Sequence, residues 1–139
     1  VASVSGVLGL PPDECKPARP VPIFHVHGTA DKTVPYEGGG AAGGLGSLVN
    51  IKFRSVKETI ATFQSKFTCE VQAKETFKGG DTRCEEWSNC QGGARLDLCT
   101  VTEGGHQWPG GKPTPVGGKT SDFMTTRAVL DFFEAHPMP

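Results

Sequence analysis

The clearest hydrophobic pattern in the chain is an amphipathic helix after Ser55. Apolar side chains recur at intervals of three or four residues at Val56, Ile60, Phe63 and Phe67. Lysine, glutamate and glutamine side chains occupy positions between them, as on the exposed side of a helix. Ser55 and Glu58 have the spacing of a capping box, in which each residue satisfies the other's backbone N–H. The pattern predicts a helix that begins after Ser55.

Short apolar runs before this helix are typical of strands. The first covers positions 1–8, and a proline-broken loop follows it. Positions 21–26 are β-branched or aromatic apart from Pro22 and His25, and the run is too short for a helix. We therefore expect a buried strand at 21–26.

After Cys69 the pattern changes to three strand-like pieces, near 71–77, 83–87 and 94–102. Glycine-containing turns at 79–81 and 91–93 separate them. Short strands joined by such turns favour an antiparallel hairpin.

The last element is a helix expected from about Asp122 to Ala135, with Ser121 as its cap and Pro137 after its end. Its predicted apolar stripe consists of Phe123, Leu130 and Phe133. Together with the preceding elements it predicts an α/β layered fold, in which helices cover one sheet.

Length and charge narrow the class of protein. The chain has 139 residues, enough for one domain, and a formal net charge of -1 from 14 basic and 15 acidic residues. This balance favours neither nucleic acid nor an anionic membrane as a partner, and no apolar stretch approaches the roughly 20 residues of a membrane span. We therefore expect a neutral substrate.

The five cysteines indicate an oxidising compartment and hence secretion, because the paired spacings of a zinc site do not occur. If the second turn is centred near 91 and 92, partners across the hairpin sum to about 183, and Cys84 then faces Cys99. Cys69 and Cys90 would pair by elimination, although four cysteines allow three connectivities. Cys15 is left over, and an odd cysteine often has its partner outside the sequence.

Asp31 is the first candidate for chemistry. It follows the strand expected at 21–26, and catalytic groups of open α/β sheets lie at the carboxyl ends of strands. An acid held there by backbone amides can orient an imidazole. The alternative is an aspartate that only stabilises a turn.

His106 is the second candidate, 75 residues (106 minus 31) after Asp31. Gly104 and Gly105 allow unusual backbone angles, Pro109 restricts the loop, and Trp108 offers an apolar wall for a binding pocket. A surface histidine and an ordinary, partly buried tryptophan are the alternatives.

A glycine cluster at 38–46 contains a formal G-x-G-x-x-G match at Gly38, Gly40 and Gly43. The residues after it are a poor helix start, whereas a phosphate site needs a helix N-terminus there. We interpret the cluster as a flexible loop.

Two segments resemble the secreted esterases of the polyhydroxybutyrate-depolymerase and feruloyl-esterase type in the α/β-hydrolase superfamily. They are 27–36, His-Gly-Thr-Ala-Asp-Lys-Thr-Val-Pro-Tyr, and 104–111, Gly-Gly-His-Gln-Trp-Pro-Gly-Gly. The opening Val-Ser-Gly at 4–6 resembles the strand that follows the nucleophile helix in that family. The resemblance implies that Asp31 and His106 are the acid and base of a catalytic triad.

It also implies that 1–139 is a single partial α/β-hydrolase domain. This part would hold the C-terminal portion of the sheet, flanking helices and a disulfide-stapled β-hairpin. A nucleophile motif G-x-S-x-G does not occur, and Ser5, Ser47 and Ser121 do not have its flanking glycines. We therefore expect the serine and the oxyanion hole in a missing N-terminal half of the domain, and a nearly inactive chain without it.

The expected substrate is an ester, in a polymer such as hydroxyalkanoate polyester or feruloylated polysaccharide, with Trp108 in the substrate pocket and no metal or other cofactor. A metal-dependent hydrolase that uses His25, His27 and Asp31 is one alternative, since His-x-His on a strand points both rings to one face. Otherwise, we expect His25 in the core and His27 in a turn. A non-catalytic, glycan-binding module that uses Trp87 and Trp108 is the other.

Overall fold

The structure is a computed structural model that describes residues 1–40, 51–115 and 117–137. Its strands and helices are β1 (Ala2–Val4), β2 (Ile23–Gly28), β3 (Gly39–Gly40), β4 (Lys52–Phe53), α1 (Val56–Phe67), β5 (Lys74–Gly79), β6 (Thr82–Trp87), β7 (Leu96–Val101) and α2 (Thr125–Ala135). Within these ranges, no helix has the length and apolar character needed to cross a membrane.

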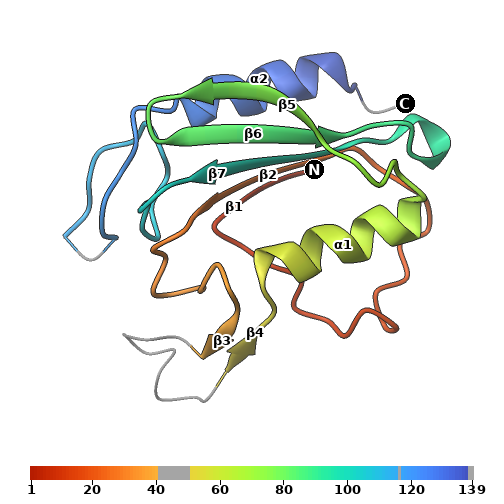
Figure 1. Cartoon of the computed structure of the whole chain (residues 1–139), viewed down its shortest axis with the longest axis horizontal. Coiled ribbons are helices and arrows are strands. Elements are labelled where there is room, and N and C mark those ends of the chain that lie inside the picture. Colours follow the sequence, from red (N-terminus) through yellow and green to blue (C-terminus); the bar gives the residue numbers. More distant parts are fainter. Residues whose placement is uncertain (41–50, 116, 138–139) are drawn as a thin grey trace.

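Five strands form one mixed sheet in the order β1-β2-β7-β6-β5 (Figure 1). The strands β1, β2 and β7 are parallel neighbours, whereas β6 and β5 continue the sheet in antiparallel register. The short strands β3 and β4 pair separately. A mixed sheet with helices packed on it is an α/β fold.

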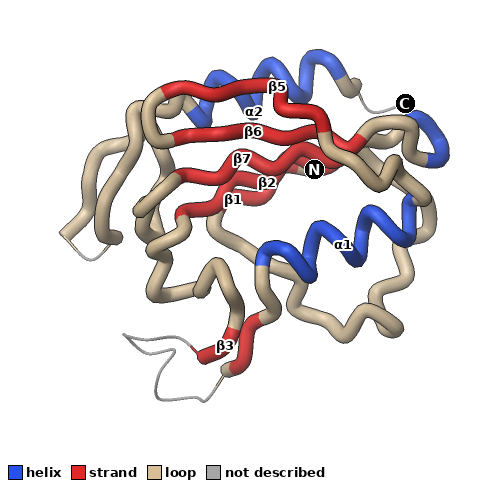
Figure 2. The backbone as a smooth tube through the Cα atoms, viewed as in Figure 1, coloured by secondary structure: helices blue, strands red, loops and turns tan. Residues whose placement is uncertain are grey.

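The two helices cover opposite faces of the sheet (Figure 2). Neighbouring residues of a strand point to opposite faces. Phe24 and Val26 of β2 therefore pack with Val129 and Phe132 of α2. On the other face, the intervening side chains of β2 and β7 meet α1, in two clusters that include Ile23, Leu96 and Phe67, and Leu98, Val56 and Ile60.

The predicted helix after Ser55 is confirmed as α1. The Ser55 hydroxyl accepts a hydrogen bond from the Glu58 N–H at 3.0 Å, and the Glu58 carboxylate accepts one from the Ser55 N–H at 2.8 Å. Val56, Ile60 and Phe67 are buried, as the pattern predicts.

The two N-terminal strands differ from their predicted ranges. The strand expected at 1–8 is limited to Ala2–Val4, because Ser5 has a left-handed backbone with φ of 55°. The strand expected at 21–26 begins at Ile23 and continues to Gly28. The prediction that His27 is a turn residue is therefore wrong, since His27 lies within β2 and is fully buried.

The hairpin register pairs Cys84 with Cys99, as the sequence predicts. These two cysteines form one disulfide, and Cys69 and Cys90 form the other. The first joins β6 to β7, and the second ties the end of α1 to the loop after β6. Cys15 is buried and unpaired in the part of the chain that the structure describes.

The prediction for the last helix is wrong at its start and on its buried face. Helix α2 begins at Thr125, and Met124, which precedes it, makes no capping hydrogen bond with its side chain. The Ser121 hydroxyl instead accepts from the Phe123 N–H and donates to Asp81. The residues that α2 buries are Thr125, Val129 and Phe132. Of the predicted apolar stripe, Phe123 packs against the core from just before the helix, whereas Leu130 and Phe133 are exposed.

The glycine cluster at 38–46 lies mostly outside the described residues. Its first part forms β3, which pairs with Lys52 and Phe53 of β4. Gly43, the last glycine of the formal phosphate match, is not among the described residues.

The ends of β2 and β7 are held together by close backbone contact. The Ala30 N–H donates to the Gly104 carbonyl at 2.9 Å, and the Glu103 N–H donates to the Thr29 hydroxyl at 2.8 Å. Any Cβ atom on Gly28 would collide with the backbone of Gly104. Only glycine at 28 therefore permits the two loops that follow these strands to touch.

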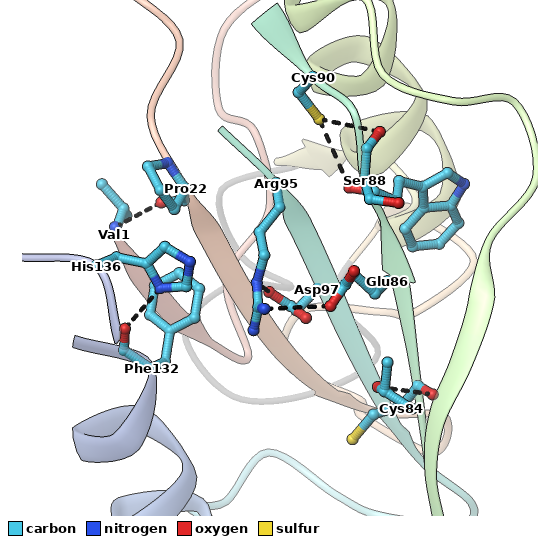
Figure 3. Close-up of polar contacts among 12 residues, drawn as sticks. Val1, Pro22, Cys84, Glu86, Ser88, Cys90, Arg95, Asp97, Phe132 and His136 are labelled. Atoms are coloured by element: carbon cyan, nitrogen blue, oxygen red, sulfur yellow. Dashed lines mark hydrogen bonds and ion pairs between the residues drawn. The ribbon is translucent and has the colours of Figure 1, made fainter. Parts of the chain in front are cut away.

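One charged cluster lies on the α2 side of the sheet. Figure 3 shows Arg95 between two carboxylates, bonded to Asp97 at 2.8 Å and to Glu86 at 3.2 Å. The Arg95 guanidinium also lies over the Phe132 ring, 5.7 Å from its centroid. Burial raises the pKa of Asp97 to about 6, although the charge of Arg95 opposes the shift.

This shift predicts how Asp97 affects stability as the pH changes. Because the folded pKa lies above the ordinary value of 3.8, the contribution of Asp97 is present below pH ~4 and is lost as the pH rises through about 6. We expect Asp97→Asn to remove this loss, which amounts to about 3 kcal/mol. Urea unfolding of both proteins between pH 4 and 7 measures it. Parallel stability profiles would contradict the prediction.

The contact between Gly28 and Gly104 predicts a second stability effect. Gly28→Ala is expected to lower the free energy of unfolding by about 1–3 kcal/mol, because rigid backbone must move to admit the methyl group. Gly9→Ala is the matched control, since a Cβ at Gly9 meets no atom within 4 Å. Equal unfolding midpoints for the two variants in urea would show that the contact does not require glycine.

Candidate functional site

The carboxylate of Asp31 is held in the loop after β2. Its Oδ1 accepts hydrogen bonds from the N–H groups of Thr33 and Val34, both at 2.8 Å. The residue is only 4% exposed. The turn that the sequence allowed as an alternative role for Asp31 is thus present, and it leaves the second carboxylate oxygen for another partner.

His106 lies in the loop after β7, and backbone contacts hold that loop on both sides of it. The Gly105 N–H donates to the Lys119 carbonyl at 2.8 Å, and a Cβ on Gly105 would collide with Gly117. The buried Gln107 side chain accepts from the Thr114 N–H at 2.7 Å and donates to the Gly118 carbonyl. The backbone that carries the imidazole is therefore fixed in place.

The structure brings Asp31 and His106 together. The Nδ1 atom of His106 lies 2.8 Å from Oδ2 of Asp31, a hydrogen-bond distance. The two residues meet because β2 and β7 are adjacent parallel strands, whose carboxyl ends share one edge of the sheet. The His106 side chain is 39% exposed, so its ring reaches solvent while the carboxylate is enclosed.

The environment keeps Asp31 ionised. Burial raises the pKa of its carboxyl, but hydrogen bonds from His27, the Val34 amide and His106 together hold the pKa below its usual value. An ionised carboxylate accepts a hydrogen bond from the Nδ1–H group of His106, which leaves the other ring nitrogen unprotonated and able to act as a base. The pair can therefore take up and return a proton at the surface.

His27 also contributes to this site, in a role beside Asp31 that the sequence did not predict. The Nε2 atom of His27 is 2.9 Å from the Val34 carbonyl and 3.4 Å from Oδ2 of Asp31. The available signal was the His-x-His spacing before the acid, which puts both rings on one face of a strand. From the sequence alone, that spacing indicates a metal site.

His25 and His27 lie side by side, with 3.2 Å between His25 Nε2 and His27 Nδ1. His136 lies at the end of α2, where its ring bonds to the Phe132 carbonyl. Among the described residues, no group of three histidine, cysteine, aspartate or glutamate side chains is placed to hold a metal ion.

The two tryptophans occupy different surroundings. Trp108 is 46% exposed, and its indole N–H donates to the Thr126 hydroxyl in the first turn of α2 at 2.9 Å. Trp87 is partly buried and packs with the clusters on the α1 side of the sheet. Because α1 and α2 cover opposite faces, these side chains do not form the shared platform that a glycan-binding module would need.

Comparison with known proteins finds similarity to two proteins named as esterases. The chain is 36% identical over 102 residues to "Feruloyl esterase B" of Piromyces equi, a match that covers 71% of this chain and 18% of that protein. It is 31% identical over 146 aligned positions to "Putative esterase NocK" of Nocardia uniformis subsp. tsuyamanensis, which covers 95% of this chain and 42% of that protein.

The chain thus spans less than half the length of each of these relatives. No family model matches it, and no solved structure matches it. The chain therefore has an α/β fold in which a buried aspartate is hydrogen-bonded to a loop histidine. It is similar to part of two proteins named as esterases.

Proposed function

We propose that this chain is the acid and base portion of a serine carboxylic-ester hydrolase, and that 1–139 is part of an α/β-hydrolase domain. The observation that carries the proposal is the 2.8 Å contact between His106 and the buried carboxylate of Asp31. Similarity to two proteins named as esterases supports the same reaction class.

In this mechanism Asp31 holds the Nδ1–H tautomer of His106. The Nε2 atom then removes the proton of a serine hydroxyl as the serine oxygen attacks the ester carbonyl. The proton passes to the leaving alcohol, which departs and leaves an acyl-serine. Water, activated by the same nitrogen, attacks the acyl group, and the serine recovers its proton as the carboxylic acid is released.

In this proposal the serine belongs to a segment outside this sequence. The chain has no G-x-S-x-G motif, and among the described residues no serine hydroxyl bonds to the His106 ring. Both relatives extend well beyond the matched region. The same segment would supply the oxyanion hole, so we expect the chain alone to be nearly inactive.

The proposed substrate is an uncharged ester in a polymer, either feruloylated polysaccharide or hydroxyalkanoate polyester. The near-zero net charge fits a neutral substrate, and the exposed indole of Trp108, two positions after His106, offers an apolar contact. No cofactor enters the proposed reaction. Two disulfides are compatible with an extracellular protein, which is the location that we propose.

Loss of His106 tests the reaction. In the full-length protein, His106→Ala is expected to lower kcat for p-nitrophenyl acetate on the order of a million-fold, because the serine loses its base. His136→Ala is the control, since the His136 ring contacts Phe132 of α2 and takes no part in the contact between Asp31 and His106. Circular dichroism establishes that each variant is folded. Hydrolysis by folded His106→Ala at the rate of the control would reject the proposal.

Loss of the Trp108 ring tests the substrate contact. Trp108→Ala in the full-length protein is expected to raise KM for methyl ferulate on the order of tenfold, with kcat nearly unchanged, because a flat apolar contact with the substrate is lost. Phe133→Ala is the control, since that ring is similarly exposed, at 45%, but lies on α2. Equal KM values in both variants would remove Trp108 from the binding site.

A further inference from the structure

We propose that His27 is a positioning residue, which fixes the Asp31 carboxylate in the orientation that receives His106. This proposal deepens the one above, because Asp31 and His106 are the acid and base of the proposed reaction. The geometry that points to it is a line of buried polar contacts behind the acid, which runs from His25 through His27 to Asp31.

The contacts of the carboxylate leave one orientation for it. Its Oδ1 is held by two backbone N–H groups, those of Thr33 and Val34. Its Oδ2 lies between two imidazoles, 2.8 Å from Nδ1 of His106 and 3.4 Å from Nε2 of His27. Because His27 is on the buried side and His106 on the exposed side, His27 limits how far the carboxylate can turn away from the base.

His27 donates at Nε2 in this arrangement. The Val34 carbonyl, 2.9 Å from that nitrogen, can only accept a hydrogen bond, so Nε2 carries a proton. The same N–H faces Oδ2 of Asp31 at the longer distance. His27 therefore connects the carbonyl and the carboxylate of one short loop, and it holds Val34 in a position from which the Val34 N–H can reach Oδ1.

The ring of His27 is itself fixed from two sides. The ring of His25 lies edge to edge with it, at an interplanar angle of 17°, and a hydrogen bond of 3.2 Å joins one nitrogen of each ring. The Tyr36 ring packs against it at an interplanar angle of 80°, and the Tyr36 hydroxyl is hydrogen-bonded to the Thr100 hydroxyl of β7 at 3.0 Å. His27 is 0% exposed and His25 2% exposed, so neither ring can move without repacking.

The protonation of the buried groups agrees with a positioning role for His27. Burial, together with the charge of His27, lowers the pKa of His25 to about 3, so His25 is uncharged near neutral pH. Burial also raises the pKa of Asp31, but the hydrogen bond from His27 is the largest of the contributions that lower it. The two imidazoles that face this carboxylate, His27 and His106, therefore both favour its ionised form.

A matched pair of substitutions in the full-length protein tests the proposal. His27→Met removes the donor, whereas His27→Gln has similar length and keeps an N–H donor. We expect His27→Met to lower kcat for p-nitrophenyl acetate about a hundredfold with little change in KM, as for a misplaced catalytic group. His27→Gln is expected to recover most of kcat. Equal kcat values in both variants would overturn the proposal.

A second readout does not depend on esterase activity. In nuclear magnetic resonance spectra of the same proteins, His27→Met is expected to raise the pKa of the Asp31 carboxyl and to lower the fraction of His106 protonated at Nδ1. His27→Gln is expected to preserve both. If His27→Met lost only stability and left both quantities unchanged, His27 would be a packing residue and the proposal would be wrong.

The spectra also separate the two proposals. If the wild-type protein does not hydrolyse esters, but His27→Met still produces these spectral changes, the proposed function is refuted and the role of His27 is supported. Should His27→Met fail to fold, His25→Met removes one of the two rings that fix His27 and leaves His27 itself in place. It is expected to shift both quantities in the same direction but less, and no shift would overturn the proposal.

Discussion

The parallel pairing of β2 with β7 is the constraint on which the candidate site depends. It places the carboxyl ends of two strands, 73 residues apart at their last positions (101 minus 28), at one edge of the sheet. The loops that follow can then touch, but only because Gly28 has no side chain where Gly104 passes. The 2.8 Å contact between Asp31 and His106 follows from this approach, with one partner buried and the other open to solvent.

The sheet gives the site rigid strands, and the loops at their ends carry the exposed polar groups. Helices on both faces, and a disulfide between β6 and β7, fix the strands, while the two loops present the polar groups. Burying His25 and His27 on the α1 side of the sheet costs free energy unless their ring nitrogens make hydrogen bonds. The contacts of His27 with Val34 and Asp31 offset that cost. The buried histidines therefore also help to hold the loop that carries Asp31 at the edge of the sheet.

The similarity to two proteins named as esterases and the geometry of the site both fit the proposed ester hydrolysis. Acid and base chemistry needs only a held carboxylate and an accessible imidazole, and both are present. Covalent catalysis also needs a nucleophile and donors for the oxyanion, and these are the parts that the proposal assigns to a segment outside the sequence. The division follows the order Ser, Asp, His of such enzymes.

Several features could be predicted from the sequence because they depend on interactions between residues close in the chain. The period of α1, its Ser55 cap and the register that joins Cys84 to Cys99 depend on residues close in the chain, and Asp31 and His106 stood out by their flanking turns. Only tertiary structure decided the buried face of α2 and the place of His27. Both depend on which side of a strand or helix meets a distant element, and that choice is a property of the packed sheet.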